Sequence, residues 1–315
     1  MNIKEKLLRK ERSWTDILIL VLIQAYLWMQ LGGFLAMKVL QADKWGYLFT
    51  DNAEIAADIG EYFVSFGFWI SMVLGLVVFK KNRKLLKPLC LEKKMDIFKG
   101  MGLGLLAGFV LNASIIAGAI ATGSLSYTKG NIQVLPIIGY FAAILFQAGG
   151  EELICRMYIM GKLKRRYKSP AVAIAGNSLL FTVLHLGNPG VTVTSVVGVL
   201  AASILFSLIV YYFENIWTAI AMHTAWNFTQ TIIFGLPNSG MTSPYSILNT
   251  EKAISGFCYD AGFGVEGSFG AVIAICLVIA AILLISKKKG NCDTISLPDN
   301  ERENAERKLF AEELR

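Results

Sequence analysis

Eight stretches of the chain are predominantly apolar over about 17 to 25 positions, the length at which a helix crosses a bilayer core of roughly 30 Å. They are residues 15–37, 63–79, 98–121, 134–160, 170–186, 192–213, 216–236 and 270–285. Hydrophobic residues make up 55% of the 315 residues and charged residues only 17%, whereas soluble domains carry about 25% charged residues. The sequence therefore predicts an all-α, polytopic membrane protein of about eight transmembrane helices.

Basic residues gather beside these apolar stretches. Short runs rich in Lys and Arg occupy residues 4–12, 80–84, 162–168 and 287–289. With a cytoplasmic N-terminus, eight crossings return the C-terminus to the cytoplasm and place most of the 30 Lys and Arg residues on that side, as the positive-inside rule requires. Membrane topology thus accounts for the net charge of +7, and we expect the lipid bilayer, not a nucleic acid, as a partner. In a bacterial source the protein would lie in the plasma membrane.

The first apolar stretch is too long for a signal-peptide core and is not followed by a small-residue cleavage site, so we expect a retained helix. We expect three regions: residues 1–130 with three helices, 131–236 with the fourth to seventh apolar stretches, and 237–315 as an outer loop, a last helix and a polar cytoplasmic tail. A short helix is expected in the tail over residues 302–314. The five cysteines form no CxxC pair and are expected to be free thiols: Cys90, Cys155, Cys258, Cys276 and Cys292.

Two acids and an arginine interrupt the fourth apolar stretch. An ionisable group at membrane depth costs at least about 2.5 kcal/mol, so such a group indicates a site unless it is paired. Glu152 and Arg156 are four residues apart and can neutralise each other on one helix face. Glu151 is turned about 100° away from Glu152 and lacks that partner, which makes it a candidate general base. The alternative is a helix-packing salt bridge with one further acid at its edge.

The only two histidines of the chain, His185 and His223, both lie in apolar stretches. Asn227 follows His223 by one helical turn, so both side chains share a face. A single histidine in a membrane helix often makes only a hydrogen bond to a neighbouring helix. Together with Glu151, however, the two histidines form a set of groups suited to catalysis.

Hydrolysis of a peptide bond needs a base that takes a proton from water and donors that stabilise the oxyanion. Glu151 and His185 are suited to activating the water, and His223 and Asn227 to forming the oxyanion site. Glu151, His185 and His223 are also a possible zinc ligand set. The sequence lacks HExxH and asparagine is a poor zinc ligand, so we favour a metal-free reaction with no cofactor and keep zinc as the alternative.

Three motifs occur in order on successive hydrophobic segments: Glu151-Glu152-xxx-Arg156, Phe181-xxx-His185 and His223-xxx-Asn227. They resemble those of the CPBP family of CAAX-type proteases and bacteriocin-processing enzymes, also called the Abi family, over residues 134–235.

The resemblance implies an eight-helix intramembrane endopeptidase that acts on a membrane-associated peptide or protein, with residues 131–236 as a CAAX-protease-like catalytic core. It assigns Glu151 as base, His185 to water activation, and His223 with Asn227 to the oxyanion, supported by Glu152 and Arg156. The motifs do not distinguish a metalloprotease from a glutamate-dependent protease.

A non-enzymatic membrane protein is the competing interpretation, either a bacteriocin-immunity scaffold or a proton-coupled transporter. Transporters often contain internal repeats, and none is evident here. The acids, histidines and amide instead lie in one part of the chain, which favours a single catalytic centre.

The candidate residues are expected at different depths in the membrane. From the cytoplasmic helix ends, a rise of about 1.5 Å per residue places Glu151 about 15 Å, His185 about 22 Å and His223 about 10 Å deep. Tilts or breaks must therefore bring them to one cavity, and Gly149 with Gly150 are one place where we expect bending. A second place is Gly187 with Pro189. We expect Cys155, Phe181 and Trp226 to serve mainly in packing.

Overall fold

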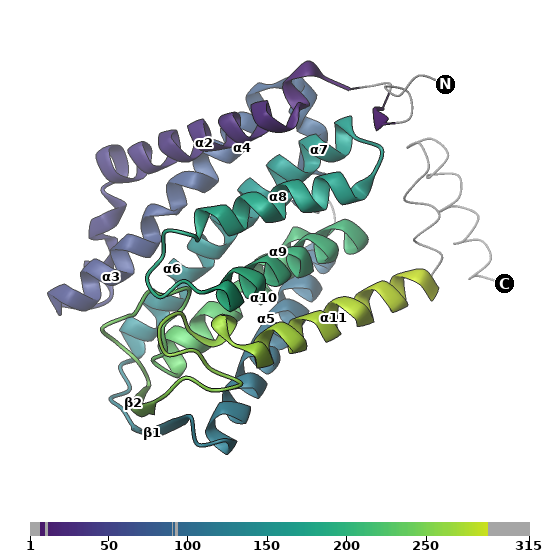
Figure 1. The fold of residues 1–315 in the computed structure, drawn as a ribbon. Coiled ribbons are helices and arrows are strands. Elements are labelled where there is room, and N and C mark those ends of the chain that lie inside the picture. The colour runs from purple at the N-terminus through teal and green to yellow at the C-terminus, as the bar shows by residue number, and fades with distance from the viewer. Residues whose placement is uncertain (1–6, 10–11, 90, 92–93, 289–315) are drawn as a thin grey trace.

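The computed structural model describes residues 7–9, 12–89, 91 and 94–288 and is mostly helical (Figure 1). Its α-helices are α2 (Leu18–Phe34), α3 (Ala53–Val64), α4 (Phe66–Val78), α5 (Lys94–Ala121), α6 (Val134–Glu152), α7 (Met160–Arg166), α8 (Pro170–Leu184), α9 (Val193–Phe213), α10 (Ile216–Phe228) and α11 (Phe269–Lys288). Short 3-10 segments are η1 (Trp14–Asp16), η3 (Ala42–Leu48), η4 (Lys80–Leu89) and η7 (Val265–Gly267). Three π-helical segments are η2 (Leu35–Leu40), η5 (Leu153–Ile159) and η6 (Thr229–Ile233). The helix expected in the tail lies outside the described residues.

Within the described residues, six helices are long and apolar enough to cross a membrane. They are Leu18–Leu40, Ala53–Val78, Asp96–Ala121, Val134–Arg166, Val193–Phe213 and Phe269–Ser286, and Pro170–Leu184 is a shorter apolar helix. The stretch expected at 216–236 forms α10 and η6 but is not among the six, and it carries His223, Asn227 and Gln230. A multi-span membrane protein is confirmed, whereas the count of eight and the side of the termini stay predictions.

The second span begins ten residues earlier than the expected residue 63. The Asn52 side chain caps α3 by accepting hydrogen bonds from the backbone N–H groups of Glu54 and Ile55. Ile55, Ile59 and other apolar side chains then form the buried face of α3, although acids alternate with them in the sequence. Because its acidic and apolar residues alternate, α3 does not form a continuous apolar stretch, and the sequence analysis therefore placed the start of this span too late.

A two-stranded antiparallel ribbon corrects the all-α expectation. Strand β1 (Leu125–Lys129) follows α5 and pairs with β2 (Leu248–Ala253), which lies beyond α10. The ribbon lies at the end of the molecule opposite α7 and the beginning of α2 (Figure 1). It joins two inter-helix segments that are distant in sequence, so the segment after α10 is held to the helical core.

Helix α10 is central because its backbone approaches α5 closely. A Cβ on Gly104 would lie 2.3 Å from the carbonyl oxygen of Thr218, and one on Gly108 would lie 2.2 Å from that of Met222. Only small residues permit such an approach between membrane helices. His223 and Asn227 on α10 are almost fully buried as well.

No break interrupts the helix at Gly149 and Gly150, where we expected bending. Helix α6 continues through both glycines, where added Cβ atoms would lie 2.1 Å from the Trp69 ring and 3.1 Å from the carbonyl oxygen of Ser65. The glycines therefore serve close packing against α4 and the residue before it. The change of helix geometry comes later, where η5 follows Glu152.

The expected break after His185 is confirmed. Helix α8 has 15 residues, which rise about 22 Å, less than the roughly 30 Å of a bilayer core. His185 is its C-terminal cap, and turns follow through Gly187 and Pro189 until α9 begins at Val193. A short helix with a terminal histidine can present that side chain within the helical bundle instead of beyond it.

Candidate active site

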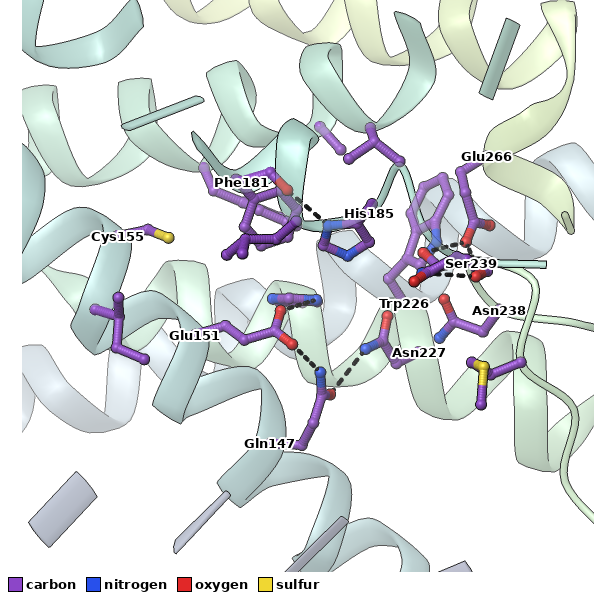
Figure 2. A pocket seen from close by; sticks show the side chains of 18 of the residues that line it. Gln147, Glu151, Cys155, Phe181, His185, Trp226, Asn227, Asn238, Ser239 and Glu266 are labelled. Carbon is purple, nitrogen blue, oxygen red and sulfur yellow. Dashed lines mark hydrogen bonds and ion pairs between the residues drawn. The ribbon is translucent and has the colours of Figure 1, made fainter. Parts of the chain in front are cut away.

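One cavity of about 400 Å³ receives all four residues that the sequence suggests for catalysis. Glu151 comes from the last turn of α6, His185 from the end of α8, and His223 and Asn227 from α10. Figure 2 shows Glu151, His185 and Asn227 around this cavity. The structure thus brings the candidate residues together, while their chemical roles stay predictions.

Glu151 is connected to Asn227 through a glutamine. Gln147, one turn before Glu151 on α6, donates from Nε2 to Glu151 Oε1 and accepts at Oε1 from Asn227 Nδ2 at 3.1 Å (Figure 2). A single amide thereby orients both the carboxylate and the asparagine. The sequence analysis missed Gln147 because an amide carries no charge, although its spacing of four residues from Glu151 was visible.

Glu152 is fully buried and has two partners on the same oxygen. Its Oε1 lies 3.0 Å from Arg156 Nη1, which confirms the predicted pair, and 3.0 Å from His223 Nδ1. His223 Nε2 lies 3.8 Å from Glu151 Oε2. Since Nδ1 faces Glu152, the imidazole is oriented with Nε2 toward Glu151 and the cavity.

Arg156 is held by several contacts in the interior. Its Nη2 donates to the carbonyl oxygen of Ser203 at 3.0 Å and to the Ser203 hydroxyl at 2.7 Å. Its guanidinium lies 4.8 Å from the ring centroid of Phe181 and 5.5 Å from that of Phe206. These contacts fix the cation that balances Glu152.

The tautomer of neutral His185 follows from one backbone contact. Its Nδ1 lies 2.7 Å from the carbonyl oxygen of Phe181, which can only accept a hydrogen bond. Nδ1 therefore carries the proton and Nε2 is left unprotonated. His185 lines the cavity, so it is suited to accepting a hydrogen bond from a water molecule there.

The donor set does not form a metal cluster. Among the residues that the structure describes, no three side chains of His, Cys, Asp or Glu are grouped so that they could hold a metal ion. Glu151, His185 and His223, the ligands of the zinc alternative, are thus not grouped in this way in the described part of the chain.

The segment between α10 and α11 contributes residues that the sequence analysis did not single out. Ser239 and Glu266 line the same cavity (Figure 2). Asn188, from the turns between α8 and α9, lines it as well. Buried Glu266 accepts hydrogen bonds from Gln230 Nε2 at 2.6 Å and from the Ser239 hydroxyl at 3.0 Å. Burial raises the pKa of Glu266 above its ordinary value. Asn188 donates to the carbonyl oxygen of Ser239 at 2.9 Å, so Ser239 is held from two sides. These contacts join residues that are far apart in the sequence, and no sequence motif marks them.

Phe181, Trp226 and Cys155 are buried in the hydrophobic core and also line the cavity. Cys155 is 2% exposed and is a free thiol, as are Cys258 and Cys276. Cys90 and Cys292 lie outside the described residues. The burial of Phe181 and Trp226 agrees with their predicted packing role. The structure shows in addition that both residues line the cavity.

The comparisons with known proteins agree with the motifs. Residues 133–229 match the family model described as "Type II CAAX prenyl endopeptidase Rce1-like". This range lies within the expected core of residues 131–236. No curated protein and no solved structure shows a significant match to the chain. Residues 133–229, which carry the three motifs and most of the residues of their common cavity, thus form a domain of the Rce1-like, CAAX-type protease family, also called CPBP or Abi.

Proposed function

We propose that the protein hydrolyses a peptide bond of a membrane-associated peptide or protein, with Glu151 and His185 activating water. The observation that supports this most is the meeting of Glu151, His185 and Asn227 at one cavity inside a CAAX-protease domain. Glu151 Oε2 is buried and has no hydrogen-bond partner among the described atoms. An unsatisfied carboxylate oxygen at a cavity is well suited to holding a water molecule.

The proposed reaction begins with a water molecule between Glu151 and His185 Nε2. Glu151 takes a proton from the water, whose oxygen bonds to the carbonyl carbon of the substrate. The carbonyl oxygen becomes an oxyanion, which accepts hydrogen bonds from Asn227 Nδ2 and His223 Nε2. When the carbon–nitrogen bond breaks, the proton on Glu151 passes to the leaving nitrogen, and Glu151 is again a carboxylate.

His223 acts in this scheme as an imidazolium. It donates from Nδ1 to Glu152, as the 3.0 Å contact allows, and from Nε2 to the oxyanion. Glu152 and Arg156 keep the ring in this orientation and are positioning residues. Neutral His185 and charged His223 thus have different roles, because one faces a carbonyl oxygen and the other a carboxylate.

We also propose that both termini are cytoplasmic and that the chain crosses the membrane about eight times. Figure 1 supports this with α7 and the beginning of α2 at one end of the molecule. The basic run of residues 162–168 begins in α7, and η4 carries the run of residues 80–84. The division into regions 1–130, 131–236 and 237–315 stays a proposal.

His185→Ala and His223→Ala are each expected to reduce peptide cleavage by about 100- to 1,000-fold, because each removes one donor or acceptor of the reaction. Cleavage by the purified variants is measured on a membrane-embedded peptide and compared with the original protein. Near-normal cleavage by either variant would return that histidine to a packing role. Unchanged thermal unfolding would show that lost activity does not result from lost structure.

Gln147→Leu is expected to lower kcat by about tenfold, with a smaller change in KM, because the amide orients Glu151 and Asn227 without touching the reacting atoms. Gln147→Glu is a matched variant of the same shape that places a second carboxylate beside Glu151. It is expected to be less active than Gln147→Leu at neutral pH. A wild-type kcat in both variants would show that Gln147 does not position the site.

A further inference from the structure

A second cavity of about 580 Å³ lies apart from the candidate active site. Side chains from η1, α2, η4, η5 and α7 line it, and none of them lines the first cavity. Four of the lining residues are cations: Lys80, Lys81, Lys162 and Arg165. No carboxylate is among the lining residues within the described part of the chain.

The charge around this cavity is positive. Buried Asp16, beside the cavity, is bound by Arg165 through two contacts of 2.7 Å and lies 3.5 Å from Lys162 Nζ. One carboxylate therefore serves two cations. Lys80 and Lys81 are exposed, and their side chains have no partner among the described residues. Two further positive charges at the cavity are thus available to an anion.

The rest of the cavity wall is apolar. Leu27, Leu31 and Phe79 line it and are 59%, 38% and 54% exposed, which is unusual for a cavity in a soluble protein but ordinary for a lipid-facing groove. Leu31 lies seven residues beyond Gln24, a rise of about 10 Å along α2. Gln24 itself accepts a hydrogen bond from Lys162 Nζ at 2.6 Å. Along α2, the apolar wall at Leu31 therefore lies about 10 Å from the position where Lys162 contacts the helix.

We propose that this cavity binds one anionic phospholipid. Lys80, Lys81 and Lys162 contact the phosphate, and an acyl chain lies along Leu27 and Leu31. Basic pockets between membrane helices at the cytoplasmic surface bind acidic lipid headgroups through this combination of charge and apolar contact. A zwitterionic lipid fits less well, because no lining carboxylate within the described residues would pair with its ammonium group.

Native mass spectrometry of the purified full chain tests the proposal. The protein in detergent is titrated with phosphatidylglycerol, with phosphatidylcholine and with inorganic phosphate. The test variant is Lys80→Gln/Lys81→Gln. The matched control is Arg83→Gln/Lys84→Gln, which removes the same charge from exposed residues of η4 that do not line the cavity.

We expect one retained phosphatidylglycerol on the original protein and on the control, and roughly 10- to 30-fold weaker binding to the test variant. Equal loss in both variants would overturn the proposal, because it would indicate a general attraction of the basic surface. Equal binding of phosphatidylcholine would also overturn it. Displacement of the lipid by millimolar inorganic phosphate would assign the site to free phosphate. Equal thermal unfolding of the variants serves as the check on folding.

Discussion

Glu151→Gln is expected to reduce peptide cleavage by about 100- to 10,000-fold while the protein stays folded. Glutamine has nearly the shape of glutamate and can still contact Gln147, but it cannot take the proton of the attacking water. Because Glu151 is not the partner of Arg156, its replacement leaves the buried ion pair intact. The measurement is single-turnover cleavage of a membrane-embedded peptide by purified protein.

Cys155→Ala is the control from the same cavity wall. The thiol is buried and has no step in the proposed reaction, so this variant is expected to keep most of the activity. An inactive Cys155 variant beside an active Glu151→Gln would show that the mechanism is wrong. A chain that cleaves no peptide in any form would instead favour the non-enzymatic interpretation.

Arg156→Met is expected to lower the free energy of unfolding by about 3 to 5 kcal/mol, because it leaves the buried carboxylate of Glu152 without its cation. The change also removes both hydrogen bonds to Ser203. The measurement is denaturant unfolding in a fixed detergent, followed by circular dichroism. An unchanged unfolding free energy would show that the pair does not stabilise the fold.

Glu152→Gln/Arg156→Met is the companion variant, since it removes both charges. It is expected to recover much of the stability that Arg156→Met loses. Its cleavage activity is expected to stay low, because a neutral amide in place of the Glu152 carboxylate cannot balance a protonated His223. The double variant would then recover unfolding free energy without recovering cleavage activity.

Local spacing explains what the sequence could predict. Glu152 and Arg156 are one turn apart, as are His223 and Asn227, and a helix fixes such neighbours without knowledge of the rest of the fold. The cost of charge in a membrane made the acids conspicuous. Gln147 has the same spacing from Glu151 but no charge, so nothing in its chemistry called attention to it.

Tertiary contacts explain what the sequence could not predict. The Glu152–His223 contact joins residues 71 positions apart, and Glu266 reaches the cavity from a segment without a motif. The apolar stretch at residues 170–186 also suggested a full crossing, but α8 has 15 residues, which are too few for a straight crossing. Strands β1 and β2 were not predicted because each is short and polar. Their stability comes from pairing with each other.

From the close approach of α5 and α10, we expect parts of the molecule to differ in mobility. Where Gly104 and Gly108 of one helix meet backbone oxygens of the other, no side-chain layer can rearrange, so sliding or separation would break many contacts together. We therefore expect the two helices to move as one body, together with His223 and Asn227. Helix α8 is short and ends in turns, so we expect any displacement of His185 to occur relative to this pair of helices.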